Sequence, residues 1–181
     1  MTQMNQKPPE RAVFDCLVFE INYFSSYTYL MPREISAGII IYRKTPEGPK
    51  FLLLYHGHNY WNFAKGKIES EEKSFQTALR EIKEETGLTK DDLRFSQYFK
   101  AYEKFSFWRR VGNKNARIFK IVIFYLAETK QAAIKLSKEH DGYGWFTYRE
   151  AMKILSKYKD SQRVLKQAYD ALRRQSIKSG Q

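Results

Sequence analysis

The chain has 181 residues and carries 32 lysines and arginines against 20 aspartates and glutamates, which gives a formal net charge of +12. Its hydrophobic fraction of 43% and charged fraction of 29% exclude a disordered chain and predict one folded domain. The single cysteine, Cys16, excludes an intramolecular disulfide, and no segment reaches the roughly 20 apolar residues of a membrane helix. We therefore expect a cytoplasmic protein with no membrane partner, whose positive charge favours polyanionic partners such as nucleotides or RNA.

The first third of the chain predicts strands. Residues 1–32 form an N-terminal extension of unknown role, in which the aromatic-rich stretch 12–30 is typical of a strand. Pro32 interrupts regular structure at the end of this extension. Two apolar runs then predict buried strands on either side of a turn that contains proline and glycine: 36–44, the turn at 45–49, and 50–56. Residues 59–67 predict a short irregular segment.

Residues 70–86 predict an amphipathic helix. Apolar side chains recur at three- and four-residue steps and form one stripe: Phe75, Ala78, Leu79 and Ile82. Ser70 is the expected N-cap, and Glu71 and Glu72 suit the positive end of the helix dipole. Gly87 is the expected residue after the helix, because glycine adopts the left-handed conformation that ends many helices.

The second half of the chain predicts further strands followed by two helices. Strand-like stretches at 93–107 and 118–128 flank a basic turn at 109–117, and a shorter strand covers 142–146. Strands and helices thus alternate along the chain. This order predicts an α/β fold with a mixed sheet between helices.

The two C-terminal helices have clear sequence signals. Thr147 and Glu150 form a capping box, with threonine at the cap and glutamate three residues later. The helix that follows carries one apolar face: Ala151, Ile154, Leu155 and Tyr158. A second helix begins at Asp160 or Ser161 and presents its own stripe: Val164, Leu165, Ala168 and Leu172. The chain from Arg173 onward is basic and expected to fray.

A cluster of carboxylates on the helix before Gly87 is the strongest functional signal. Glu81 and Glu85 are four residues apart and share one face, and Glu84 lies beside that face. Like charges at this spacing repel, and a cation between them reverses that cost. Carboxylate oxygens suit Mg²⁺ or Mn²⁺, and substrate phosphates often complete a magnesium shell. Arg80 can orient a carboxylate through its planar guanidinium, and Glu72 can join or brace the cluster.

The segment that carries these carboxylates has a defined spacing. It consists of Gly66, five residues, Glu72, seven residues, and then Arg-Glu-Ile-x-Glu-Glu-x-Gly-Leu over 80–88. This pattern resembles the Nudix box at every defining position. The resemblance implies an α/β/α Nudix sandwich over 33–175, with a basic tail at 176–181. It also implies hydrolysis of a nucleoside diphosphate that is linked to another group.

The same resemblance implies roles for the box residues. Glu81, Glu84 and Glu85 are implied ligands of a divalent metal, Mg²⁺ or Mn²⁺, and the backbone carbonyl of Lys65 is another. The side chain of Lys65 is expected to neutralise bridging phosphate oxygens. Arg80 and Glu81 are expected to belong to the catalytic group together with a general base.

The flanks of the box resemble one branch of the superfamily, the animal-type diadenosine tetraphosphate hydrolases. The similarity runs from about 36 to 171 and is sharpest at LSKEH, 136–140. That family carries a glutamate there in a loop that approaches the metal, and Glu139 matches it. The resemblance implies that Glu139 is a metal ligand or the general base for the attacking water, and Glu85 is the other candidate base. Ala64 stands where the family usually has proline, which predicts a looser loop before the box.

Candidate substrate contacts lie outside the box. His56 and His58 alternate along the end of a predicted strand and share a face, and His56 is a candidate contact to a phosphate or base. The segment 98–120 mixes cations with aromatics, a combination that holds phosphate chains and stacks bases. In the resembled family an aromatic pair clamps an adenine. The candidates are Phe107 or Trp108 with Tyr143 for this clamp, and Lys104 and Arg109 for the phosphates.

Three functions stay open at this level. The first is asymmetrical hydrolysis of diadenosine tetraphosphate to ATP and AMP by attack of water on phosphorus. The second is removal of pyrophosphate or cap from RNA 5′ ends, because AKGKI before the box resembles the mRNA-decapping Nudix enzymes and the net charge is +12. The third is a catalytically idle Nudix domain that binds nucleotide or RNA. The intact glutamate set argues against the third, since a binding module has no need of a repulsive cluster.

Overall fold

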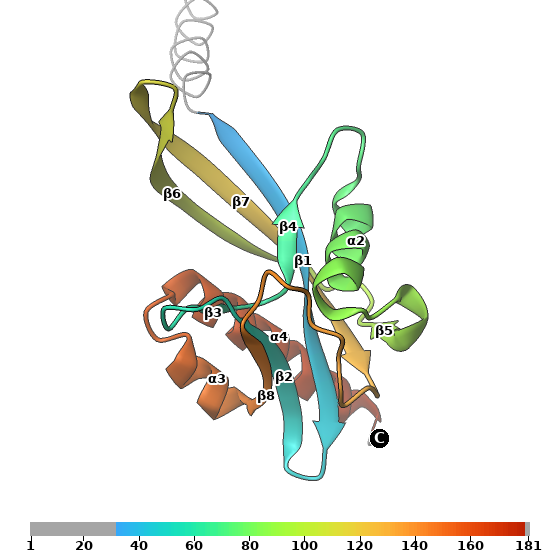
Figure 1. The fold of residues 1–181 in the computed structure, drawn as a ribbon. Coiled ribbons are helices and arrows are strands. Elements are labelled where there is room, and N and C mark those ends of the chain that lie inside the picture. Colours follow the sequence, from blue (N-terminus) through green and yellow to red (C-terminus); the bar gives the residue numbers. More distant parts are fainter. Residues whose placement is uncertain (1–31, 180–181) are drawn as a thin grey trace, which may run out of the picture.

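A computed structural model describes residues 32–179 (Figure 1). In chain order its elements are β1 (Arg33–Thr45), β2 (Gly48–Tyr55), β3 (Trp61–Asn62), β4 (Lys65–Lys67), α2 (Ser74–Thr86), the 3₁₀ turn η1 (Lys90–Asp92), β5 (Leu93–Phe95), β6 (Ala101–Val111), β7 (Lys114–Thr129), β8 (Gly142–Thr147), α3 (Tyr148–Ile154) and α4 (Lys159–Ser179). The strand predicted at 12–30 lies outside the described residues. None of the helices between residues 32 and 179 has the length and apolar character needed to cross a membrane.

The strands form one mixed sheet. Its central path runs β3–β2–β1–β7–β5, while β4 pairs with β1, β8 with β2 and β6 with β7. β1 and β7 are parallel, from Arg33 opposite Phe119 to Tyr42 opposite Glu128, and the other pairings are antiparallel. The predicted mixed sheet is therefore confirmed.

Helices cover both faces of this sheet, which explains why β1 is apolar at consecutive positions. Successive side chains of a strand point to opposite faces, so a strand between two helical layers is buried on both. Ile40 packs in one cluster with Leu165 of α4, whereas Ile39 packs in the other cluster with Ala78 and Ile82 of α2. Figure 1 shows α2 apart from α3 and α4, with the sheet between them. The predicted α/β/α sandwich is confirmed.

Several local predictions are confirmed. Gly87 has a φ of 71° in the left-handed region, and its N–H donates to the carbonyl of Lys83. At the start of α3, the hydroxyl of Thr147 accepts from the Glu150 N–H at 3.4 Å, and the Glu150 carboxylate accepts from the Thr147 N–H at 2.8 Å. The predicted stripe of α4 is buried: Val164, Leu165, Ala168 and Leu172.

The predicted start of the box helix is wrong. α2 begins at Ser74 with Lys73 as its N-cap, not at Ser70. Glu71 has a φ of 71°, so the chain turns before the helix and no acidic residue lies in its first turn. The side chain of Gln76 accepts the Lys73 N–H at 2.9 Å, which satisfies a donor that the serine was expected to serve.

Other predicted boundaries also shift. The segment 59–67 is not irregular, because it contains β3 and β4. The strand predicted at 93–107 is divided into β5 and β6 by a turn. α3 ends at Ile154, so Tyr158 lies beyond it, and α4 continues to Ser179 where fraying from Arg173 was expected.

The predicted basic turn at 109–117 is mostly strand. β6 continues to Val111 and β7 begins at Lys114, so that Gly112 and Asn113 form the turn, with Gly112 at a φ of 58°. The two strands form a long hairpin. Figure 1 shows this hairpin projecting, together with the start of β1, away from the helices.

Candidate active site

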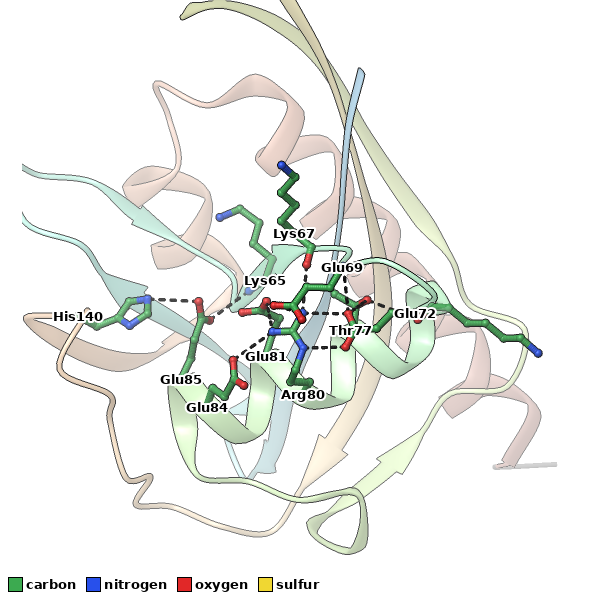
Figure 2. Close-up of polar contacts among 11 residues, drawn as sticks. Lys65, Lys67, Glu69, Glu72, Thr77, Arg80, Glu81, Glu84, Glu85 and His140 are labelled. Atoms are coloured by element: carbon green, nitrogen blue, oxygen red, sulfur yellow. Dashed lines mark hydrogen bonds and ion pairs between the residues drawn. The ribbon is translucent and has the colours of Figure 1, made fainter. Parts of the chain in front are cut away.

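The strand β4 places the start of the box against β1 (Figure 2). Gly38 is required there, because a Cβ at this position would overlap the carbonyl of Ala64. That carbonyl accepts the Ile39 N–H at 3.2 Å, and the next N–H, of Lys65, donates to Glu85 Oε2 at 3.1 Å. The segment with alanine in the place of proline is thus held by a backbone hydrogen bond to β1 and by a hydrogen bond to the Glu85 side chain of α2.

Arg80 organises the carboxylates of the box. Its Nε and Nη2 donate to the two carboxylate oxygens of Glu72 at 2.8 and 3.0 Å. Its Nη1 donates to Glu81 at 2.7 Å and to Glu84 at 3.1 Å, and Nη2 also donates to the carbonyl of Lys67 at 3.1 Å. The hydrogen bond from Arg80 lowers the pKa of Glu72 to about 2. These contacts are the ones expected if Arg80 orients carboxylates and Glu72 braces the cluster, and the catalytic roles of the box residues stay a prediction.

Glu81 lies beneath the glycine that opens the box. A Cβ at Gly66 would overlap the carboxyl group of Glu81, so only glycine leaves room for that carboxylate. Burial raises the pKa of Glu81, and the negative charge of Glu84 adds to this effect. The Glu81 carboxylate is therefore held close to β4 in a position where extra positive charge would stabilise its ionised form.

Glu85 is the most buried carboxylate of the cluster. Its Oε2 accepts the Lys65 N–H, and its Oε1 lies 3.7 Å from Nε2 of His140. Burial raises the pKa of Glu85, and the charges of Glu81 and Glu139 raise it further, against the effect of Lys65. Burial lowers the pKa of His140, so its ring faces the carboxylate in the neutral form.

A loop after β7 closes this end of the site. The N–H groups of Lys135 and Ser137 donate, each at 3.0 Å, to the last carbonyls of α2, those of Thr86 and Glu85. Helix ends leave such carbonyls without partners, so the loop caps the helix as it docks. Glu139 follows in this loop as an exposed residue whose charge acts on Glu85. Glu139 is thus near enough for its charge to act on Glu85, and its role as ligand or base stays a prediction.

The donor set fits a hard divalent cation. Glu81, Glu84 and Glu85 offer only oxygen ligands, which such an ion prefers. Across residues 32–179, no three histidine, cysteine, aspartate or glutamate side chains converge on one point. Glu72, Glu81 and Glu84 instead share the guanidinium of Arg80 (Figure 2).

The prediction that His56 and His58 share a strand face is wrong. β2 ends at Tyr55, and the following residues form a turn in which the His56 N–H donates to the carbonyl of Tyr60 at 2.9 Å. His58 lies in that turn with a φ of 49°. The His56 ring centre lies 4.4 Å from that of His140, and Nε2 of His56 is buried without a hydrogen-bond partner among the described residues. His56 therefore reaches the site through His140.

The structure does not bring the candidate aromatic pair together. Tyr143 lies on β8, opposite Leu54 of β2. Phe107 and Trp108 lie on β6, which pairs with β7 on the other side of β1. Within the sheet, β8 and β6 therefore lie on opposite sides of β1 (Figure 1), because β8 pairs with β2 and β6 pairs with β7. A clamp that joins Tyr143 to either β6 residue is not formed in this arrangement.

The two candidate cations have different surroundings. Arg109 donates to Glu34 Oε2 at 2.8 Å, and Lys120 donates to Glu34 Oε1 at 2.7 Å, so Arg109 is part of an ion-pair group. Lys104 is exposed and has no ion pair within the described part of the chain. Of the two, only Lys104 is free to meet a phosphate.

Sequence reasoning missed His140 and Ser137. The Ser137 hydroxyl lies 3.0 Å from Nδ1 of His140, which fixes the ring beside Glu85. His140 is 55 positions from Glu85 in the chain, and only the fold brings them together. Its place next to Glu139 in LSKEH was the one available signal.

The NUDIX domain model matches residues 32–168. The chain therefore belongs to the Nudix domain family and is a pyrophosphohydrolase that acts on phosphoric anhydrides.

Its relatives narrow the class. The chain is 33% identical over 147 residues to the asymmetrical bis(5′-nucleosyl)-tetraphosphatase of Sus scrofa, covering 76% of this chain and 94% of that protein. The Mus musculus protein of the same name is 34% identical over 148 residues, with coverage of 76% and 94%. Among solved structures, a C. elegans Ap4A hydrolase binary complex has a TM-score of 0.60 and 29% identity, covering 77% of this chain and 96% of that one. The resemblance to diadenosine tetraphosphate hydrolases is confirmed.

Proposed function

We propose that the protein hydrolyses dinucleoside polyphosphates asymmetrically, converting diadenosine tetraphosphate and water into ATP and AMP with the help of Mg²⁺ or Mn²⁺. The similarity to enzymes named for this reaction supports the proposal. The observation that carries it is the environment of Glu85, a buried carboxylate between the Lys65 N–H and His140, within reach of the charge of Glu139. Such a group combines metal binding with proton transfer in one place.

The oxygen ligands for the ion are the carboxylates of Glu81, Glu84, Glu85 and Glu139 and the carbonyl of Lys65. Held by these oxygens, a divalent ion would supply charge neutralisation of phosphoryl oxygens and would make water more acidic. Arg80 keeps Glu81 and Glu84 oriented, since it hydrogen-bonds to both. The protein's part is thus to hold the oxygen ligands in a fixed arrangement.

Proton transfer falls to Glu85 or Glu139. Either carboxylate accepts the proton of the attacking water as the water oxygen bonds to phosphorus and the bridging P–O bond breaks. His140 is a positioning residue, which Ser137 orients and which limits the movement of the Glu85 carboxylate.

Substrate contacts follow from the surroundings of the carboxylates. Burial lowers the pKa of Lys65, and the charges of Glu85, Glu103 and Glu81 oppose this effect. We propose the Lys65 side chain as the cation for the bridging oxygens of the substrate. Tyr143 lies opposite Leu54 in the sheet, and His56 follows Leu54 by two residues, so Tyr143 and His56 lie at the same end of β2. We propose Tyr143 and His56 as contacts to one nucleoside, with Phe107, Trp108 and Lys104 available to a longer substrate.

Product analysis by anion-exchange chromatography tests this function. The full chain is incubated with diadenosine tetraphosphate and Mg²⁺, beside a Glu85→Gln variant and a Glu47→Gln control. Glu47 lies in the turn that joins β1 to β2. We expect release of ATP and AMP that falls about 10²- to 10⁴-fold in Glu85→Gln and is retained in Glu47→Gln. Equal turnover by all three proteins would contradict the assigned role of Glu85.

RNA 5′-end hydrolysis is the second candidate, favoured by the exposed cations of the β6–β7 hairpin. The same experiment therefore includes 5′-triphosphorylated RNA. Pyrophosphate release from RNA with the dinucleotide left intact would replace the first proposal with the second. No turnover of either substrate would favour an idle binding domain or another nucleotide substrate.

A further inference from the structure

One face of the β6–β7 hairpin is free of carboxylates. In β6 this face carries Tyr102, Lys104, Ser106, Trp108 and Arg110, because alternate residues of a strand share a face. Strand register adds the side chains opposite them: Ile123, Ile121, Phe119, Arg117 and Asn115 from β7, and Arg33 and Ile35 from β1. We call this set the hairpin face. It combines four cations with three aromatic rings and contains no acidic residue.

The opposite face of the same strands differs. There Glu34 is buried and accepts hydrogen bonds from both Arg109 and Lys120, so its charge is matched by neighbours. On the hairpin face, Lys104, Arg110 and Arg117 make no ion pair with any residue between 32 and 179. Their positive charge is therefore available to a partner.

Two of the three aromatic residues of the hairpin face, Tyr102 and Trp108, are open to solvent, and Phe119 is half-buried. Trp108 is 71% exposed and lies directly opposite Arg117, while Tyr102 is 44% exposed near the base of the hairpin. From Lys104 to Arg110 the strand rises about 20 Å, which gives an extended line of cations and rings. A line of this kind is the chemistry that binds single-stranded nucleic acid, since cations hold the phosphates and aromatic rings stack the bases.

We infer that the hairpin face binds single-stranded RNA. Charge complementarity selects a polyanion, and exposed rings between the cations select one with unstacked bases. RNA is favoured over DNA because the enzyme acts on phosphoric anhydrides, which RNA carries at a 5′-triphosphate end. The inference concerns binding on the hairpin, and only its choice of RNA over DNA rests on the anhydride chemistry of the site on α2.

Fluorescence anisotropy of the full chain with a labelled oligouridylate of about 12 nucleotides tests this surface. The probe carries a 5′-hydroxyl, so that the hydrolytic site has no anhydride to bind. We expect Arg110→Ala/Arg117→Ala to bind at least about tenfold more weakly and to reduce the slope of log K against log salt by about 1.4, or 0.7 for each lost contact. The matched control Arg149→Ala/Arg173→Ala removes two exposed arginines of α3 and α4 and should leave both values unchanged.

A second variant tests stacking. Trp108→Ala should weaken binding about tenfold, and Trp108→Phe should retain most of it, because a ring is needed rather than an indole N–H. Thermal melting checks that both variants fold, and the double arginine variant should hydrolyse diadenosine tetraphosphate at the rate of the unmodified chain. Failure of that hydrolysis in every protein would leave the RNA result intact, so the two proposals fail separately.

Three results would overturn the inference. Equal weakening in the Arg149→Ala/Arg173→Ala control would show attraction by net charge alone. Equal affinity for a thymidine oligodeoxynucleotide of the same length would remove the assignment to RNA. Binding to vesicles that contain phosphatidylserine, without binding to the oligouridylate, would identify a membrane contact instead.

Discussion

Charged side chains gather in two regions of this protein, and their surroundings differ. At the α2 site, carboxylates lie in a network: Arg80 contacts Glu72, Glu81 and Glu84. On the hairpin face, Arg110 and Arg117 stand in solvent without an acidic partner among the described residues. The first region is an organised anionic centre, and the second is an open cationic surface.

This difference suits the α2 site to catalysis and the hairpin face to the attraction of a polyanion. Partly buried charges that hydrogen-bond to one another stay in one geometry, which a reaction at phosphorus requires. Exposed and unpaired cations keep their mobility and their long-range field, which draws in a polyanion without fixing its register. Mutations in the first region should therefore act on kcat, and mutations in the second on the affinity for a polyanion and its salt dependence.

After the loss already expected for Glu85→Gln, the largest expected effect is that of Arg80→Ala. Removing the guanidinium leaves Glu72, Glu81 and Glu84 without their shared partner, so the carboxylates repel and lose their arrangement. We expect kcat for diadenosine tetraphosphate to fall about 10²- to 10³-fold, with little change in oligouridylate affinity. Arg80→Lys keeps the charge but not the bidentate contact to Glu72, so it should recover only part of the rate. A rate within threefold of the unmodified chain would show that the network does not position the ligands.

A smaller effect, confined to the position of one carboxylate, is expected from Gly66→Ala. The added Cβ would overlap the Glu81 carboxyl group and displace it from beneath β4. Misplacement of a ligand by about 1 Å can cost about 10²-fold in rate, so we expect a loss of up to that size in kcat. Gly142→Ala is the matched control, since its Cβ would meet only Tyr55 at 3.8 Å. Equal activity of the two variants would argue that Glu81 tolerates displacement.

The base of the hairpin should show a pH-dependent stability. Hydrogen bonds from Lys120 and Arg109 lower the pKa of Glu34 below its ordinary value of 4.5, against the effect of burial. A lowered pKa contributes stability above the unfolded-state pKa, and this contribution is lost as pH falls through the folded-state value. Glu34→Gln should therefore cost about 2 kcal/mol in urea unfolding at about pH 7 and progressively less below about pH 4. A cost that does not change with pH would contradict the ion-pair account.

The two regions differ in how far the sequence predicts them. The box spacing and the apolar stripe are local, so the roles of Arg80 and Glu72 and the end of the helix at Gly87 were accessible from residues alone. The start of the helix was not. Ser70 has the chemistry of a cap. However, the chain turns at Glu71, where φ is positive, and the Glu72 side chain hydrogen-bonds to Arg80, so the helix begins only at Ser74.

Properties that depend on strand register were beyond the sequence. The segment 98–120 is visibly basic and aromatic, but only pairing shows that Arg109 shares a face with Glu34 while Trp108 and Arg110 do not. The same holds for His140, which a loop of about ten residues carries to Glu85. A motif predicts the ligands of a site, whereas the fold decides which distant residues surround them.

The smallest expected effect lies outside both regions and serves as a control for the effect of lost stability on kcat. Thr147→Ala removes the hydroxyl that caps α3 and contacts Glu150 at 2.8 Å. An N-cap of this type is worth about 1 kcal/mol, so we expect that loss in urea unfolding and no change in kcat or in oligouridylate affinity. Thr147→Ser should restore the stability, because serine caps as well as threonine does. If Thr147→Ala lowered kcat as well, a general loss of stability would explain part of the Arg80 and Gly66 effects, and the assignment of those residues to catalysis would need the folded fraction of each variant measured first.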